Sequence, residues 1–335
     1  MIASRSAYAA ECSGAREAGP RVSHRLGIDI GGTKTALALA DAAGAIVARE
    51  RFPTEPSGSA EDDLLRIAAR ARALAEASGV GWPEVEAVGV SLPGPFDRRG
   101  GRVLHPPNLP GWGVVAVRDV LEAALERPVR LENDANAAAL AEWRYGAGQG
   151  CQNLVYLTMS TGIGAGMILG GRLHVGHRDF AGEIGHTPVA WPGERCACGF
   201  DGCLEAYVGG AAWQRRLRAV APPEGAIAVR AGGQGQIRPE DAVAAAHAGD
   251  AFAIAELERL ADYLSRALAQ LVFSVSPERI VLGTIAVAAG EALFFEPLRR
   301  RVAERTWPGQ AHAVEILPAS LGEDGPFRAG LCAAD

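Results

Sequence analysis

Arg25-Leu26-Gly27-Ile28-Asp29-Ile30-Gly31-Gly32-Thr33-Lys34-Thr35 is the stretch that decides the fold. Its first six residues are typical of a short buried strand, and the two glycines that follow predict a tight turn. Residues 35–40 predict a second strand directly after that turn, and residues 45–52 predict a third beyond the turn at 41–44. The stretch therefore opens an antiparallel meander whose first turn is rich in glycine.

Outward from this meander, helical and strand patterns alternate. Helices are predicted at 61–78, 117–126, 135–145 and through most of 240–275; further strands are predicted at 85–90, 129–131, 154–159, 165–169 and 279–283. The strand, glycine turn and strand of the opening recur at 154–169, where Ser160-Thr161-Gly162-Ile163-Gly164 forms the turn. Alternating strands and helices predict an α/β fold, and the repeated hairpin predicts two related domains around a central cleft that holds the ligand.

Composition limits the classes of function. The 335 residues are enough for two domains, and with 48% hydrophobic and 21% charged residues the chain is typical of a globular protein. The formal charge of −6 provides no overall basic field, so we expect no nucleic-acid partner. Apolar runs fall short of the roughly 20 residues that span a bilayer, and residues 1–24 lack the apolar core of a signal peptide. We therefore expect no membrane partner, a flexible N-terminal tail at 1–24 and a cytoplasmic location.

One cluster of side chains is typical of a metal site. His186 precedes Cys196-Ala197-Cys198-Gly199-Phe200-Asp201-Gly202-Cys203 by ten residues. One imidazole and three thiolates are a tetrahedral set that zinc prefers. Because His186, Cys196, Cys198 and Cys203 would fill all four coordination positions, the predicted zinc is structural. The alternative is that three cysteines share a loop by chance.

The two glycine turns are candidates for binding phosphate. Gly31 and Gly32 allow backbone N–H groups to approach a phosphate, and Thr33 and Lys34 add a hydroxyl and a charge. Asp29 is placed to hold Mg²⁺ through water. Taken alone, each turn is no more than a hairpin turn, because neither has the spacing of a Walker loop or a dinucleotide fingerprint. Two such turns, with Thr161 and Gly162 in the second, predict a grip on a triphosphate from both sides.

Asp134 lies where the predicted strand at 129–131 gives way to a helix. A carboxylate in this place is ordinarily a helix N-cap, and the other interpretation is a general base that accepts a proton from an attacking hydroxyl. Polar residues elsewhere favour the base. Asn108, Glu183, His186 and Glu205 are an amide, two carboxylates and an imidazole, which are groups that bind sugar hydroxyls.

Together these residues resemble the ROK family of sugar kinases and repressors, within the actin-like ATPase superfamily. The resemblance runs from about Leu26 to the end of the chain and rests on motifs in the family's order: Asp29–Lys34, Ser91-Leu92-Pro93-Gly94-Pro95, Asn108-Leu109-Pro110-Gly111-Trp112, Glu132-Asn133-Asp134-Ala135-Asn136, residues 161–164, Gly182-Glu183-Ile184-Gly185-His186 and residues 196–205.

The resemblance implies two ribonuclease-H-like domains around the cleft: a small one from residues 25–131 plus 322–335, and a large one from 132–321 that carries the zinc loop. It implies ATP with Mg²⁺ as co-substrate and transfer of phosphate to the 6-hydroxyl of a hexose. Asp134 would be the catalytic base, and the sugar would contact Asn108, Asn133, Asp134, Glu183, His186 and Glu205. A homodimer is usual in the family.

His186 would serve twice, on zinc with one ring nitrogen and on the sugar with the other, which makes zinc an organiser of the sugar site. Two positions depart from the family's pattern. Gly283-Thr284-Ile285 stands where a run of three glycines usually contacts adenosine, and Ser160 replaces a common glycine of the second turn. Both departures concern contacts to the nucleotide. Gly283 is the one glycine of the usual run that is present, and it is the candidate for contacting adenosine.

The identity of the hexose stays open at this point. The cysteine loop and residues 182–186 favour glucose, with N-acetylmannosamine or N-acetylglucosamine as alternatives. Two other classes compete: a sugar-sensing ROK regulator and a catalytically silent sugar-binding protein. We expect neither, because about 25 residues before Ile28 are too few for a DNA-binding domain, and because Asp29, Lys34 and Asp134 are all present.

Overall fold

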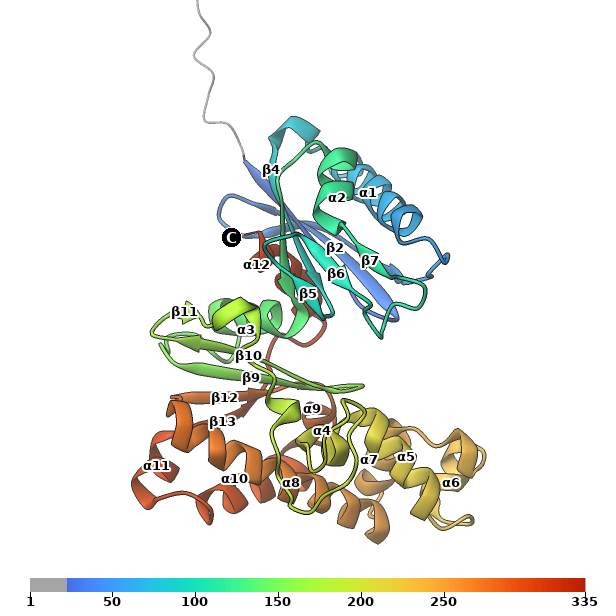
Figure 1. Ribbon diagram of the computed structural model, residues 1–335, viewed down its shortest axis with the longest axis vertical. Helices are drawn as coiled ribbons and strands as arrows, with labels where there is room; N and C mark the ends of the chain where they lie inside the picture. Colours follow the sequence, from blue (N-terminus) through green and yellow to red (C-terminus); the bar gives the residue numbers. More distant parts are fainter. Residues whose placement is uncertain (1–22, 335) are drawn as a thin grey trace, which may run out of the picture.

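The computed structural model describes residues 23–334 and contains two five-stranded sheets that lie one beyond the other along the molecule (Figure 1). The first sheet has the order β3-β2-β1-β4-β8. Its strands are β1 (His24–Ile30), β2 (Lys34–Asp41), β3 (Ile46–Pro53), β4 (Val85–Leu92) and β8 (Val129–Asn133). The first three strands are antiparallel, and β4 and β8 continue parallel to β1.

The second sheet repeats this arrangement in the order β11-β10-β9-β12-β13. Its strands are β9 (Leu154–Met159), β10 (Ile163–Leu169), β11 (Arg172–Leu173), β12 (Arg279–Leu282) and β13 (Glu315–Pro318). Again the first three are antiparallel, and the last two are parallel to the first. The α/β prediction is confirmed, and the hairpin found twice in the sequence is the start of two sheets of identical order.

Helices cover both faces of each sheet because each strand alternates its apolar side chains between two cores. On the first sheet, α1 (Ala60–Ala77) and α2 (Val117–Leu125) bury their leucines and alanines against β1, β4 and β8. On the second, Val155, Leu157 and Met159 face a helical layer, whereas Leu154 and Tyr156 face α3 (Asp134–Tyr145). The helical layer contains α4 (Leu204–Val208), α5 (Gly210–Val220), α7 (Pro239–His247), α8 (Ala251–Val275) and α10 (Glu296–Ala303).

Two helices lie between the sheets. α12 (Gly325–Ala333) packs on β1, β2 and β4, and α3 packs on β9 and β10; the two helices also contact each other (Figure 1). Glycine permits the close approach of α12: a Cβ on Gly27 would lie 2.3 Å from the backbone nitrogen of Leu331, and one on Gly89 would lie 2.2 Å from that of Ala334. The last helix therefore packs on the first sheet, although it follows the second sheet in the chain.

The chain crosses between the sheets twice, from β8 into α3 and from β13 toward α12. A buried carboxylate joins the two crossings. Glu142, near the end of α3, accepts hydrogen bonds from the backbone N–H groups of Ala147 (2.9 Å), Ser320 (3.0 Å) and Leu321 (3.1 Å). Because its oxygens have these partners, the carboxylate can remain buried, and it fixes the second crossing to the helix that follows the first.

Where periodicity predicted an element, most ends agree to within two residues, but several elements were missed. They include the helices α5 and α10 and the short elements β5 (Phe96–Asp97), β6 (Arg102–Leu104), β7 (Val114–Val115), β11, β13, α4, α6 (Ala226–Ala231), α9 (Ile285–Gly290) and α11 (Pro308–Ala313). The predicted tail at 1–24 falls on residues 1–22, which lie outside the described residues, and β1 already begins at His24. None of the helices between residues 23 and 334 combines the length and apolar character that crossing a bilayer requires.

Candidate active site

The first glycine turn joins β1 to β2 and presents Asp29 at its start. The hairpin closes with a hydrogen bond from the N–H of Gly31 to the carbonyl of Lys34 (3.0 Å). Ser91, at the corresponding position of the neighbouring strand β4, donates its hydroxyl to Oδ1 of Asp29 (2.6 Å). Withdrawal from water raises the pKa of Asp29 to about 7, the Ser91 hydrogen bond lowers it, and the charge of Asp134 raises it again. Asp29 and Asp134 are therefore electrostatic neighbours.

The loop that carries Asn108 lies directly against this turn. A Cβ on Gly32 would be 2.8 Å from the carbonyl oxygen of Asn108, so the turn and the loop meet backbone to backbone. The loop is anchored by Trp112, whose indole Nε1 donates to Oδ2 of Asp63 in α1 (2.9 Å). Burial would raise the pKa of Asp63, but hydrogen bonds from Trp112 and Ser57 and the charge of Arg66 hold it below its usual value.

The helix cap at the strand-to-helix junction is provided by the residue before Asp134. Asn133 is the N-cap of α3: its side-chain oxygen accepts from the N–H groups of Ala135 (2.9 Å) and Asn136 (3.3 Å). Asp134 is therefore the first helical residue and not the cap. The oxygen of Asn133 is occupied by the cap, so its side-chain NH₂ is the group left for a ligand.

Asp134 is withdrawn from water. Withdrawal from water raises the pKa of Asp134 to about 6, hydrogen bonds from the backbone N–H groups of Ala135 and of Asp134 itself lower it, and the charge of Glu183 raises it. A carboxyl group with a pKa near 6 is ionised at neutral pH and binds a proton more readily than an ordinary aspartate. The structure thus brings Asp29, Asp134 and Glu183 into one electrostatic neighbourhood.

Glu183 directly precedes a short 3₁₀ turn, Ile184–His186, and His186 ends it; the N–H of His186 donates a hydrogen bond to the carbonyl of Glu183 (3.0 Å). The segment packs closely on β10. A Cβ on Gly182 would be 2.3 Å from the carbonyl oxygen of Ala165, and one on Gly185 would be 2.6 Å from that of Ile163. These close approaches require glycine and place the two predicted sugar ligands beside the second hairpin.

The second glycine turn is held by the segment that carries Glu205. Oε2 of Glu205 accepts from the N–H of Ile163 (2.8 Å), and a Cβ on Gly162 would be 2.4 Å from that oxygen. The first N–H groups of α5 donate to the carbonyls of Ser160 (2.8 Å) and Thr161 (2.9 Å). One oxygen of Glu205, which the sequence predicted to bind sugar, is therefore used to hold the second glycine turn.

Gly283 and Thr284 directly follow β12 and lie beside β9, the strand that leads into the second glycine turn. A Cβ on Gly283 would be 2.5 Å from the hydroxyl of Tyr156, so glycine is required there. Thr284 has φ 52° and ψ −111°, a conformation that a β-branched residue rarely adopts and that costs about 1–3 kcal/mol. Its hydroxyl donates to the carbonyl of Met159, next to the second turn. The backbone thus keeps a glycine-like conformation although threonine occupies the position.

The four predicted metal ligands come together. The ligand atoms of His186, Cys196, Cys198 and Cys203 all lie within 4.8 Å of one another. Sγ of Cys198 is 3.7 Å from Sγ of Cys203, and Sγ of Cys196 is 3.9 Å from Nδ1 of His186. Thiolates about 2.3 Å from one zinc ion lie about 3.8 Å apart along the edge of a tetrahedron, so the donor set and its spacing fit Zn²⁺.

Sequence reasoning missed the residues that hold the predicted ones in place. The hydroxyl of Ser91 donates a hydrogen bond to Asp29, and Glu132 accepts one from the backbone N–H of Asn133. Asp63 accepts one from Trp112, in the loop that carries Asn108. Ser91 and Glu132 lie inside motifs that the sequence analysis quoted, and their position in these motifs is the signal by which they could have been found. Asp63 gives no local signal, because its partner Trp112 is 49 residues away.

Comparison with known proteins places this geometry in a family. The ROK family profile matches residues 25–332. A glucokinase of Thermotoga maritima is 35% identical over 89% of this chain and 93% of its own length. The structure of a ROK family glucokinase from Streptomyces griseus in complex with glucose and AMPPNP has a TM-score of 0.77 and 34% identity, covering 93% of this chain and 99% of the other.

A ROK family transcriptional regulator, a homologue of the E. coli MLC protein, superposes with a TM-score of 0.80 and 25% identity. The match covers 93% of this chain and 77% of the regulator. Enzymes and regulators therefore share this fold, and function has to be argued from the site. The family itself follows from the profile, the identities and the repeated sheets: this chain belongs to the ROK family.

Proposed function

We propose that this protein is an ATP-dependent hexose kinase that phosphorylates the 6-hydroxyl of glucose. The observation that carries the proposal is the position of Asp134, a carboxylate with a raised pKa at the first residue of α3, beside Asp29 and Glu183. The similarity to the two glucokinases supports it. The two sheets are consistent with ribonuclease-H-like units of the actin-like class.

In the proposed reaction, Asp134 accepts the proton of the 6-hydroxyl as that oxygen attacks the γ-phosphorus of ATP. The new O–P bond forms as the bond between the γ-phosphorus and the β,γ-bridging oxygen breaks, and ADP leaves. Asp29 would hold Mg²⁺ through water, and the bound cation would supply positive charge that offsets the charge of the phosphates. N–H groups of Gly31 and Gly32 with Thr33 and Lys34 hold the phosphates from one sheet, and Thr161 and Gly162 from the other.

The sugar is proposed to lie among Asn108, Asn133, Asp134, Glu183, His186 and Glu205. Two contacts link these residues to the phosphate turns: Asn108 lies against Gly32, and Glu205 lies against Gly162. Gly283 is proposed to lie at the adenosine end of the site. The strained conformation of Thr284 concerns only that end, because its hydroxyl contacts β9 and not the sugar residues.

We also propose that residues 25–131 with 322–335 move as one unit against residues 132–321, closing over both substrates and excluding water. The packing of α12 on the first sheet and of α3 on the second supports these boundaries. The two chain crossings joined by Glu142 are the proposed hinge.

The test of the substrate is an assay of sugar-dependent ADP release over glucose, mannose, N-acetylglucosamine and N-acetylmannosamine, each with ATP, GTP and polyphosphate. We expect the highest kcat/KM with glucose and ATP. A higher value with either N-acetylhexosamine would assign the alternative substrate. Sugar binding without any sugar-dependent ADP release would refute the kinase and leave a sugar-binding protein or regulator.

Asp134→Asn should retain glucose binding and lower kcat about 10²–10⁴-fold, the usual contribution of a general base. Glucose affinity measured by calorimetry and kcat measured by ADP release separate the two effects. Asp119→Asn, an acidic residue in the first turn of α2, serves as the control and should match the wild type. Turnover that survives in Asp134→Asn would mean that another residue is the base.

The same residue sets the pH dependence of the wild type. Asp134 must be ionised to accept the proton, so kcat should be constant above its pKa and fall as the pH drops through about 6. Saturating Mg²⁺ removes the contribution of Asp29, because the cation favours its ionised form. A pH profile of kcat that stays flat down to pH 4.5 or so, an ordinary aspartate's range, would contradict the assignment.

Removal of zinc by a chelator should lower the melting temperature and weaken glucose binding at least about tenfold, because His186 is proposed to orient the sugar while bound to zinc. Cys198→Ser should do the same. The buried Cys151, outside the cluster, provides the control variant Cys151→Ser. Unchanged glucose affinity after verified removal of the metal would argue against the double role of His186.

We propose a homodimer, supported by large aromatic side chains that are exposed on the second half of the chain. Trp307 (69% exposed) packs edge-on against Phe273 (47% exposed) with ring centroids 5.4 Å apart, and Trp191 is 85% exposed in the zinc loop. Large exposed aromatic groups are common at interfaces. Light scattering should give twice the chain mass of 34.9 kDa, and Trp307→Glu should halve it. A monomeric wild type at assay concentration would exclude the dimer.

A further inference from the structure

Glu132 is a buried carboxylate that the proposed reaction does not use. It lies in β8 and is 3% exposed. Its Oε1 accepts hydrogen bonds from the backbone N–H of Asn133 (3.0 Å) and from Nδ2 of Asn136 (3.0 Å). Asn133 caps α3 and Asn136 lies in its first turn, so both hydrogen bonds end on the segment that holds Asp134.

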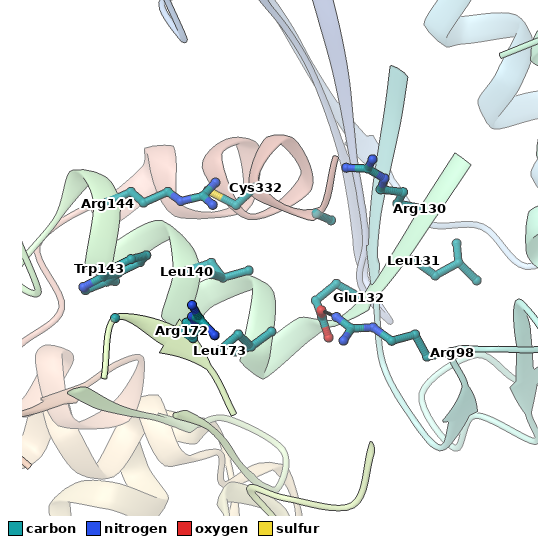
Figure 2. A pocket seen from close by; sticks show the side chains of 12 residues that line it. Arg98, Arg130, Leu131, Glu132, Leu140, Trp143, Arg144, Arg172, Leu173 and Cys332 are labelled. Atoms are coloured by element: carbon teal, nitrogen blue, oxygen red, sulfur yellow. Dashed lines mark ion pairs between the residues drawn. The ribbon is translucent and has the colours of Figure 1, made fainter. Parts of the chain in front are cut away.

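The other oxygen of Glu132, Oε2, forms an ion pair with Arg98 (Figure 2). Arg98 directly follows β5, which forms a small three-stranded sheet with β6 and β7 and precedes β8 by more than 30 residues. Burial lowers the pKa of Arg98, whereas the charge of Asp179 raises it. The guanidinium remains charged at any working pH, so it favours the ionised form of Glu132.

The ion pair lies in the wall of a pocket of about 410 Å³ (Figure 2). Other charged side chains around this pocket are Arg130, Arg144 and Arg172. Within residues 23–334, Arg98 is the ion-pair partner of Glu132. The pocket means that a small solute can reach the position of the guanidinium without unfolding the protein.

We propose that Arg98 and Glu132 are positioning residues for the reaction: Arg98 keeps Glu132 ionised, and Glu132 holds Asn133 and Asn136 so that Asp134 faces the sugar. The inference rests on the proposed role of Asp134 as the base. It adds an electrostatic link from the small sheet β5-β6-β7 to the first turn of α3, through one carboxylate.

Loss of the Arg98 guanidinium should make Glu132 bind a proton more readily. A buried carboxylate without a cation binds a proton at higher pH than an ordinary one. Protonated Glu132 is a poorer acceptor for the N–H of Asn133 and the NH₂ of Asn136, so the first turn of α3 loses part of its support as the pH falls. A displacement of the base by about 1 Å is enough to lower turnover about 100-fold.

The test compares the pH profile of kcat for Arg98→Ala, Arg98→Lys, Glu132→Gln and the double variant Arg98→Ala, Glu132→Gln, with Arg172→Ala as the control. Arg172 lines the same pocket but belongs to β11. We expect Arg98→Ala to lower kcat about 10- to 100-fold and to move its acid limb to higher pH. The control should match the wild type.

Two rescues follow from the proposal. Guanidinium chloride below denaturing concentrations should restore part of the kcat of Arg98→Ala, because the pocket admits the ion, and an equal concentration of sodium chloride should not. The double variant should recover the wild-type acid limb, because no unpaired carboxylate remains. Arg98→Lys, which keeps the charge, should also keep the acid limb. Melting temperatures identify any variant that fails to fold.

The proposal is overturned if Arg98→Ala has the kcat and acid limb of the wild type. It is also overturned if kcat is lost, guanidinium does not restore it and the double variant does not recover the wild-type acid limb, since the arginine then has only a structural role. Should Arg98→Ala not fold, a shifted acid limb in Arg98→Lys or in Glu132→Gln alone overturns it. Asp134→Asn assayed in parallel separates this proposal from the proposed role of Asp134. Activity in that variant refutes Asp134 as the general base, whatever the result for the Arg98 variants.

Discussion

The cap that Asn133 places on α3 is the interaction on which the site depends. Asn133 has an extended conformation, with φ −62° and ψ 142°. Its side-chain oxygen accepts hydrogen bonds from the backbone N–H groups of Ala135 and Asn136, in the first turn of the helix. Such a cap contributes about 1 kcal/mol and fixes where the helix begins. Because the helix begins there, Asp134 is its first residue. The helix N-terminus favours an ionised carboxylate, while withdrawal from water favours the protonated one.

The repeated sheet explains why the other groups meet at this point. Each sheet begins with an antiparallel hairpin, and each hairpin ends in a turn that needs glycine. Gly32 lies against the loop of Asn108, and Gly162 lies against Glu205, so each turn proposed to bind phosphate contacts a residue proposed to bind the sugar. Under this proposal, a shift in one sheet moves both sets of groups together, as a transfer between two bound substrates requires.

The sequence was sufficient for features that depend on neighbouring residues. The long strands and helices follow from periodicity, the glycine turns from two short motifs, and the metal cluster from the spacing of three cysteines. The structure brings His186 to those cysteines, as the sequence predicted. It separates the two roles considered for the junction, giving the cap to Asn133 and leaving Asp134 free of that role.

Features that depend on distant partners could not be predicted. The pairing of Arg98 with Glu132 and of Trp112 with Asp63 joins residues 34 and 49 positions apart, and no local pattern marks either. The strain at Thr284 was equally hidden: the sequence showed that a glycine common in the family is missing, whereas the structure shows that Thr284 has a backbone conformation usual for glycine and that its side chain forms a hydrogen bond. The short strands β5, β6 and β7 carry too few residues for a periodic signal.

A crystal structure of the protein with glucose and a non-hydrolysable ATP analogue tests the central claim most directly. The account predicts a carboxylate oxygen of Asp134 at hydrogen-bond distance, about 2.6–3.2 Å, from the 6-hydroxyl, with that hydroxyl in line with the γ-phosphorus. A complex in which the 6-hydroxyl faces another residue, or in which Asp134 points away from the sugar, would contradict it.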